Sequence, residues 1–322
     1  MADMLKITNL QKRFGDKEVL TGLDLSVPEH SIFGFIGKNG AGKTTTMKCV
    51  LGLLKPDGGE ITVAGEKAVY GQTATNRHIG YLPDVPEFYP FMTAAEFLSL
   101  CGEIAGMEKD EIRRRSAELL ELVGLDGENH RIRGFSRGMK QRLGIAQALL
   151  SRPKLLICDE PTSALDPVGR KEILDVLLAA RRETTVLFST HILSDVERIC
   201  TDAAFLNGGK IAVQGTLAEI KARYRSDTYA IETESTEGAD RLTLAFPMRR
   251  KSGNELEFAE KDCSLFDVMR FASDNRIPIV KLERMEPSLE ALFMEAERKC
   301  ENLSPFIKKT GWSRCVREES RF

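Results

Sequence analysis

Hydrophobic and polar residues alternate over 4–10 and over 19–27, and this two-residue period is typical of half-buried β-strands. Residues 31–36 form a short unbroken apolar run, SIFGFI, which predicts a buried strand. The run leads directly into the glycine-rich stretch GKNGAGKTT, and a helix is predicted over 45–54. The N-terminal part of the chain therefore predicts strands followed by a glycine loop and a helix.

Helical and strand patterns alternate in the next part of the chain. Residues 93–124 predict helices, and a further helix follows over 136–151. Apolar runs at 154–161 and 184–191 predict buried strands on either side of a helix at 168–182. This alternation favours an α/β fold in which helices cover a parallel sheet.

The pattern changes after about residue 225, where short alternating segments replace the long apolar runs. Strands are predicted at 227–234, 241–247, 255–260 and 277–285, with amphipathic helices at 264–275 and 288–299. These segments predict a small α+β appendage.

The predicted organisation is a main domain over 1–225, with a helical subdomain at about 88–150, and an accessory domain over 226–299. Residues 300–322 lack periodicity and predict a poorly ordered tail.

Composition narrows the class of protein. The 322 residues carry a net charge of −2, which argues against a dedicated nucleic-acid binder. Seven scattered cysteines without a CxxC pair indicate reduced thiols in a cytosolic protein. The N-terminus lacks the apolar core of a signal peptide, and no apolar run reaches the ~18 residues that span a bilayer. We therefore expect a soluble chain that reaches a membrane only through a partner.

A phosphate-binding loop is predicted between the strand at 31–36 and the helix at 45–54, where Gly37, Gly42, Lys43 and Thr44 match GxxxxGK[ST]. Glycines allow backbone N–H groups to turn toward phosphate oxygens, and the following helix points its positive end at them. Lys43 would reach the β- and γ-phosphates, and the Thr44 hydroxyl would bind Mg²⁺. The expected nucleotide-binding residues are Gly37, Lys38, Asn39, Gly40, Ala41, Gly42, Lys43, Thr44 and Thr45.

Two carboxylates end the predicted strand at 154–161. Asp159 is a candidate for holding Mg²⁺, directly or through water, and Glu160 is a candidate general base for an attacking water. Beside a phosphate loop, these residues favour a catalytic site over a strand that merely turns polar at the surface. Glu160 predicts hydrolysis rather than binding alone.

A second anion site is predicted at FSRGM, where Ser136 begins a helix and Gly138 follows two residues later. Over residues 4–220 the order of the phosphate loop, FSRGMKQR, ICDEPTSALD and STH resembles the ATP-binding subunits of ABC transporters. In that family the signature is usually LSGGQ, so Ser136 and Gly138 match, whereas Arg137 and Met139 depart. The resemblance implies a P-loop NTPase fold of the ABC ATPase type, with an antiparallel β subdomain and a helical subdomain, that uses ATP and Mg²⁺.

The resemblance assigns roles to five positions. Two subunits would pack head to tail, so that Ser136 and Gly138 cap the γ-phosphate held by the other subunit. His191 resembles the switch histidine that bonds the γ-phosphate and is counted with Lys43 and Glu160 as catalytic. Phe14 resembles the aromatic residue that stacks on adenine, and Asp166 in SALD resembles a loop that communicates across the dimer.

Asp84 departs from the family, which normally has glutamine after the strand that here reads IGYLPD. Aspartate is shorter and charged, and it is a candidate for contact with Mg²⁺ or with the attacking water.

An aromatic cluster of Phe88, Tyr89 and Phe91 surrounds Pro90. It is either a packed loop or, as in the family, a docking groove for a cytoplasmic helix of a transmembrane permease. The resemblance implies two partners, a permease and a second ATP-binding subunit, and a peripheral location at the cytoplasmic face of the cell membrane.

Stretches such as YLPDVPEFYP and EPSLEALFMEA resemble bacterial drug and antibiotic exporters of the bacitracin type, which implies export. Two alternatives stay open. One is a soluble ABC-type ATPase acting on ribosomes or DNA, although such proteins usually have paired cassettes or long coiled coils. The other is a non-hydrolysing regulatory subunit, against which Lys43, Asp159, Glu160 and His191 argue.

Overall fold

The computed structural model describes residues 3–72, 74–223, 227–285, 289–290 and 292–293. The chain divides into two compact units, one up to Leu217 and one from Ala218 to Met294. The predicted tail at 300–322 lies outside the described residues, as does most of the helix predicted at 288–299. The domain boundaries proposed from sequence stay a prediction.

The first unit is built on a six-stranded sheet with the order β10-β9-β3-β8-β7-β6. Its strands are β3 (Ile32–Ile36), β6 (Ile79–Leu82), β7 (Leu155–Asp159), β8 (Thr185–Thr190), β9 (Asp202–Asn207) and β10 (Lys210–Thr216). All but β10 run parallel, and β3, β7 and β8 are buried along their whole length. Because Ile36 pairs with Thr190 and Asp159 with Ser189, the carboxyl ends of these three strands meet at one edge.

A second, antiparallel sheet lies beside the first, with the order β2-β1-β4-β5. It comprises β1 (Asp3–Phe14), β2 (Lys17–Pro28), β4 (Gly58–Val63) and β5 (Glu66–Lys67). One hydrophobic core joins Leu5 and Val63 of this sheet to Phe35 of β3 and to Met47 of α1 (Lys43–Val50). The antiparallel sheet therefore supports the strand and the helix that flank the glycine loop.

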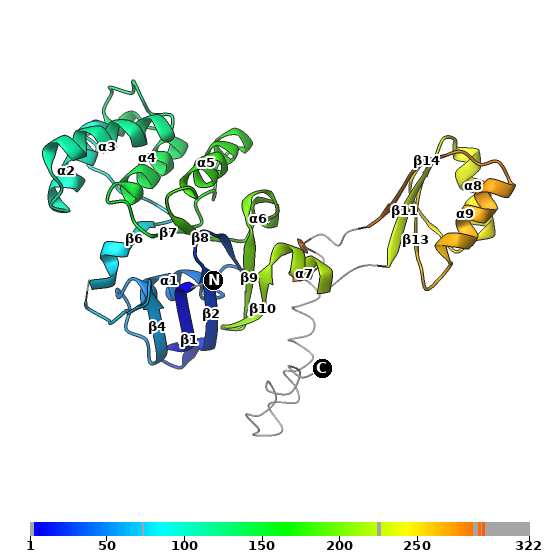
Figure 1. The fold of residues 1–322 in the computed structure, drawn as a ribbon, viewed down its shortest axis with the longest axis horizontal. Coiled ribbons are helices and arrows are strands. Elements are labelled where there is room, and N and C mark those ends of the chain that lie inside the picture. The colour runs from blue at the N-terminus through cyan, green and yellow to red at the C-terminus, as the bar shows by residue number, and fades with distance from the viewer. Residues whose placement is uncertain (1–2, 73, 224–226, 286–288, 291, 294–322) are drawn as a thin grey trace. The chain divides into compact units, whose positions relative to one another are not determined.

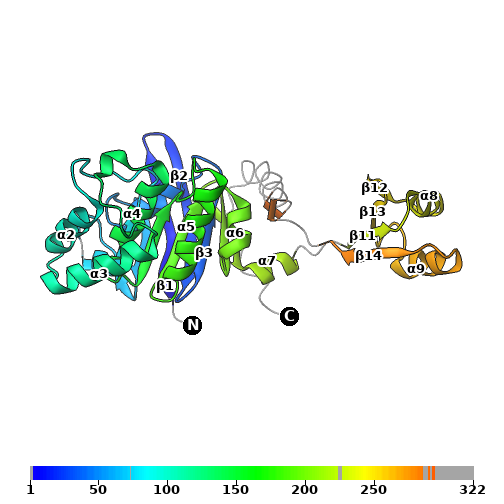
Figure 2. The ribbon, with the colours of Figure 1, turned by 90° about the horizontal axis from the view of Figure 1, so that it is seen from above.

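Three helices form a group at one end of the first unit, namely α2 (Ala94–Ile104), α3 (Lys109–Leu122) and α4 (Arg137–Leu149) (Figures 1 and 2). The short 3₁₀ turn η1 (Ala74–His78) precedes β6, and the turn η2 (Ile132–Gly134) connects α3 to α4. Helix α5 (Pro167–Ala180) follows β7, and α6 (Leu193–Ile199) follows β8. Among the described residues, no helix is both long and apolar enough to span a bilayer. The predicted α/β class, with its antiparallel and helical subdomains, is confirmed.

After α7 (Leu217–Arg223), the second unit contains a four-stranded sheet with the order β12-β13-β11-β14. The strands are β11 (Thr228–Thr233), β12 (Arg249–Ser252), β13 (Glu255–Ala259) and β14 (Ile279–Arg284). Helices α8 (Thr236–Ala245) and α9 (Leu265–Asp274) cover one face of the sheet (Figure 1). Ile231, Phe258, Leu242 and Val268 form its core, which matches the predicted α+β appendage.

The strand predicted at 241–247 is wrong, because Arg241–Ala245 belongs to helix α8. Leu242 and Leu244 suggested alternation, yet Leu242 is fully buried while Leu244 is 88% exposed. The buried positions Gly238, Ala239 and Leu242 follow the helical spacing instead. An exposed leucine on the solvent side of the helix produced the misleading two-residue period.

Candidate active site

The glycine loop connects β3 to α1 in the conformation that its sequence predicts. Gly40 and Gly42 adopt φ values of 80° and 113°, a region that other residues rarely enter. A side chain at Gly42 would also lie 2.8 Å from Leu20 Cδ2. No side chain caps the N-terminus of α1, so its first N–H groups remain available for an anion.

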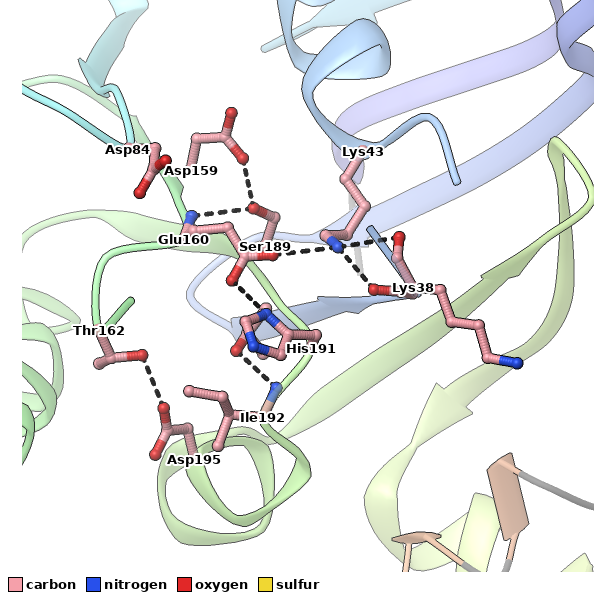
Figure 3. Close-up of polar contacts among 12 residues, drawn as sticks. Lys38, Lys43, Asp84, Asp159, Glu160, Thr162, Ser189, His191, Ile192 and Asp195 are labelled. Atoms are coloured by element: carbon pink, nitrogen blue, oxygen red, sulfur yellow. Dashed lines mark hydrogen bonds and ion pairs between the residues drawn. The ribbon is translucent and has the colours of Figure 1, made fainter. Parts of the chain in front are cut away.

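Lys43 is buried beneath this loop, with 5% of its surface exposed. Its Nζ donates to the carbonyl oxygens of Gly37 at 2.5 Å and Lys38 at 3.4 Å. The same nitrogen lies 3.0 Å from Glu160 Oε1, an ion pair that Figure 3 shows at the centre of the site. The loop residues Lys38, Asn39 and Gly40 are exposed around it.

Asp159 lies at the end of β7 and is 3% exposed. One carboxylate oxygen accepts a hydrogen bond from Thr44 Oγ1 at 2.7 Å, and the other accepts from Ser189 Oγ at 2.6 Å. The Thr44 hydroxyl and the Asp159 carboxylate supply oxygen ligands of the kind that Mg²⁺ prefers. The donor set therefore fits this ion.

Glu160 follows in a left-handed conformation, with φ 48°, which turns the chain sharply at the strand end. Its N–H donates to Ser189 Oγ at 3.0 Å. Its carboxylate pairs with Lys43 through Oε1 and with His191 Nδ1 through Oε2, at 2.9 Å. Three segments distant in sequence thus converge on one carboxylate (Figure 3).

Asp84 lies after β6 and faces the helical subdomain. Arg137 Nη2 lies 3.7 Å from its Oδ1, and its backbone oxygen accepts a 2.7 Å hydrogen bond from Gln141 Nε2. Burial raises the pKa of Asp84; Arg137 opposes this rise, whereas the charges of Asp159 and Glu160 add to it. The charge of Asp159, a candidate Mg²⁺ ligand, is thus among those that act on Asp84.

The signature segment lies at the start of α4. Ser136 is the N-cap, and its Oγ accepts a hydrogen bond from Met139 N at 3.2 Å. A Cβ atom placed on Gly138 would meet nothing in the first unit closer than 3.9 Å. The packing of this chain therefore does not require glycine there, and a close approach from outside is sterically open.

Three other predicted positions are placed as follows. Phe14 ends β1 with 49% of its surface exposed, and Lys12 Nζ lies 5.4 Å from its ring centroid. Asp166 caps α5, accepting a hydrogen bond from Gly169 N. Phe88 packs edge-on against Phe97, with ring centroids 5.0 Å apart.

A groove of about 470 Å³ borders Phe88 and Asp84. Its lining residues are Asp84, Val85, Pro86, Glu87, Phe88, Pro90, Ile132, Arg137, Lys140 and Gln141. Tyr89 and Phe91 lie nearby, with about half or more of their surfaces exposed. The predicted aromatic cluster is thus partly packed and partly exposed beside a groove.

Sequence reasoning missed two polar residues that contact the site, Ser189 and Asp195. Ser189 is a fully buried hydroxyl within strand β8, and its signal was a serine inside the apolar run TVLFST. Asp195 is 2% exposed on α6 and accepts a hydrogen bond from Thr162 Oγ1. Its partners lie 25 and 33 residues away, so no local pattern indicated it.

Comparison with known proteins identifies the family of the chain. Residues 20–163 match the ABC transporter family, and residues 215–296 match the C-terminal domain of DrrA1-3-like ATP-binding proteins. The chain is 44% identical to an uncharacterized ABC transporter ATP-binding protein of Bacillus subtilis, over 73% of this chain and 79% of that protein. It is 41% identical to a bacitracin transport ATP-binding protein of Bacillus licheniformis, over 70% and 74%.

A linearmycin resistance ATP-binding protein of Bacillus subtilis is 32% identical over 90% of this chain and 97% of that protein. Among solved structures, a dimeric ATP-binding cassette in a post-hydrolysis state with ADP and Pi is 27% identical, with a TM-score of 0.59. The match covers 66% of this chain and 99% of that structure. The chain therefore belongs to the ATP-binding subunits of bacterial ABC transporters, which bind and hydrolyse ATP.

Proposed function

We propose that Lys43, Glu160 and His191 form the catalytic group for hydrolysis of ATP in this chain. Lys43 binds the β- and γ-phosphates, Glu160 takes a proton from the attacking water, and His191 holds Glu160 and then the γ-phosphate. The observation that carries the proposal is the Glu160 carboxylate, which Lys43 contacts at 3.0 Å and His191 at 2.9 Å. These two partners hold the Glu160 carboxylate before ATP binds; once the phosphates take over Lys43, His191 would remain to hold it.

Thr44 and Asp159 are the proposed ligands of Mg²⁺, with Asp84 as a further candidate. The ion, when bound, neutralises charge that develops on the phosphate oxygens. Asp159 is held in place by Ser189, whose hydroxyl bonds both its carboxylate and the Glu160 N–H. Ser189 would thus orient the Asp159 carboxylate toward the ion and the Glu160 carboxylate toward the attacking water.

We further propose that ATP joins two copies, or this chain and a second ATP-binding subunit, head to tail. Ser136 and Gly138 would contact the γ-phosphate that the other subunit binds, and Phe14 would stack on adenine. The open space above Gly138 supports such an approach, as does the dimeric state of the solved relative. ADP lacks the bridging phosphate, so hydrolysis would reopen the pair.

The proposed partner of the ATPase is a transmembrane permease, which would hold the chain peripherally at the cytoplasmic face of the membrane. The groove beside Phe88, with Tyr89 and Phe91 exposed near it, is the proposed contact surface. The names of two relatives, a bacitracin transport protein and a linearmycin resistance protein, favour export of a drug-like compound. No role in nucleic-acid binding is proposed, given the net charge of −2.

The decisive experiment is the solution mass of Glu160→Gln, measured by light scattering with ATP and Mg²⁺, with ATP and EDTA, and without nucleotide. Loss of the base should trap an ATP-bound dimer, so the mass should double only when ATP and Mg²⁺ are both present. Adding Gly138→Asp, which places a carboxylate at the contact, should abolish doubling while ATP binding persists. A Glu160→Gln chain that hydrolyses ATP at the wild-type rate would contradict the catalytic assignment.

A further inference from the structure

A buried carboxylate on α6 makes polar contacts with two other segments of the first unit. Asp195 is 2% exposed, and both of its oxygens are engaged. Thr162 Oγ1 donates to Oδ2 at 2.7 Å, and Arg170 Nε donates to Oδ1 at 2.6 Å. Figure 3 shows the first of these bonds below the Glu160–His191 pair.

These contacts tie together three segments that surround the site. Thr162 is two residues after Glu160, Asp195 is four residues after His191, and Arg170 lies in the first turn of α5. A second bond, from Arg170 Nη2 to Ser194 Oγ at 2.7 Å, fixes the guanidinium against the same helix. Asp195 therefore links the segment that carries His191 to the loop that carries Glu160.

The loop between β7 and α5 needs such a restraint. Glu160 and Ala164 both adopt left-handed φ values, 48° and 54°, which cost energy for residues other than glycine. Inside the loop, backbone bonds run only from Ser163 N to Glu160 O and from Leu165 N to Thr162 O. Two side-chain contacts then join the loop to the chain after β8, one through His191 and one through Asp195.

Stability alone does not explain a buried carboxylate in this place. Removing a carboxylate from water is costly, and a buried ion pair often adds no stability over apolar side chains of similar size. The contacts instead fix the orientation of the Asp195 side chain, because each of its two carboxylate oxygens accepts a hydrogen bond from a different residue. We call the contacts of Asp195 with Thr162 and Arg170 the Asp195 clamp. This clamp fixes the position of Glu160 relative to His191.

We propose that Asp195 is a positioning residue for ATP hydrolysis, acting through Thr162 on the Glu160 loop, with Arg170 fixing its orientation. The inference rests on the proposed roles of Glu160 and His191. Asp195 itself lies apart from the phosphate loop and would not bind ATP. Loss of the clamp should therefore lower kcat and leave the binding of ATP unchanged.

The test compares Asp195→Asn and Thr162→Val with Asp175→Asn in the purified full-length chain. Asn removes the charge of Asp195 at nearly constant size, and Val removes only the hydroxyl of Thr162. Asp175→Asn is the matched control, because the Asp175–Arg198 pair at 3.2 Å also joins α5 to α6 but does not contact the loop. Each variant is measured for kcat, KM, dissociation constant for ATP and Tm.

Both test variants should lower kcat by about tenfold or more, since small displacements of a catalytic group cost up to about 10²-fold. Their dissociation constants for ATP should stay within about twofold, and the double variant should lose no more than the worse single one because both break the same contact. Asp175→Asn should keep kcat within about twofold of wild type. If the role of Asp195 were merely structural, the variants would have a lower Tm and a smaller fraction of active protein. The kcat per active molecule would not fall while ATP binding stayed the same.

Wild-type kcat in folded Thr162→Val and Asp195→Asn would overturn the proposal, and so would multiplicative losses in the double variant. Glu160→Gln in the same assay separates the two levels of inference. If Glu160→Gln still hydrolyses ATP, the catalytic assignment fails. If Glu160→Gln is inactive while Thr162→Val and Asp195→Asn are fully active, only the positioning role fails.

Discussion

The Lys43–Glu160 pair predicts that replacing the proposed base should make the nucleotide-free chain less stable but should tighten its binding of ATP. In the structure both side chains are largely buried, with 6% and 13% of their surfaces exposed. ATP phosphates would take over Lys43, so the pair must break before nucleotide is fully bound. Glu160→Gln removes that competition and also removes a negative charge near the triphosphate.

The size of the effect follows from the geometry. Two charges 3.0 Å apart attract by about 5 kcal/mol at an effective dielectric constant of ~20. Desolvation of the two groups offsets much of this attraction. Hydrogen bonds to charged groups contribute about 1.5–3 kcal/mol net to stability. We take about 2 kcal/mol as the loss in free energy of unfolding, which corresponds to a Tm lower by about 4–8 °C. The same energy would make ATP binding tighter by about thirtyfold.

Thermal unfolding without nucleotide and calorimetric titration with ATP measure the two effects. Glu183→Gln is the matched control, because Glu183 pairs with the buried Arg115 at 2.7 Å. It should lower Tm without changing the affinity for ATP. An unchanged Tm together with unchanged or weaker ATP binding in Glu160→Gln would refute the reasoning.

Three further outcomes are expected. The double variant Phe88→Asp with Tyr89→Asp should no longer sediment with membranes that contain the permease. Its affinity for ATP in calorimetry should stay that of wild type. If the variant still sediments with these membranes, the groove is not the contact surface for the permease. Because burial raises the pKa of Asp84, its ionised form is disfavoured in the fold, and its contribution to stability falls as pH rises through and above the ordinary aspartate value. Asp84→Asn should therefore have a Tm at least equal to wild type at pH 7, with the difference vanishing at acidic pH; a lower Tm at pH 7 would contradict this. In α8, Leu242→Ala should cost about 2–5 kcal/mol of unfolding free energy by denaturant titration, whereas Leu244→Ala should cost less than about 0.5 kcal/mol, and equal losses would argue against the helix.

The central fold was predictable because its signals are local. The apolar run at 31–36 and the glycines beyond it specify a strand and a turn within about ten residues, and β3 and α1 lie there. The strands that end at Asp159 and just before His191 were also predicted from short apolar runs. Their meeting at one sheet edge follows from the parallel arrangement, which brings carboxyl ends together.

What the sequence could not show depends on contacts between distant segments. The edge strand β12 is four exposed polar residues, so no hydrophobic pattern marks it. Its backbone pairing with β13 alone defines it. The bond from Thr162 to Asp195 likewise spans 33 residues, and each residue by itself reads as an ordinary loop or helix position.

Asp84 and Arg137 show why departures from a family pattern are best judged in pairs. In sequence, each is a separate anomaly: a carboxylate where the family has an amide, and a cation beside the signature serine. In the structure Arg137 Nη2 lies 3.7 Å from Asp84 Oδ1, and both side chains are about half exposed. A new negative charge near Asp159 and Glu160 would repel them, and the arginine partly offsets that repulsion, in keeping with the opposing effects of these groups on the pKa of Asp84. Two residues that each weaken the resemblance when considered alone thus partly offset one another electrostatically.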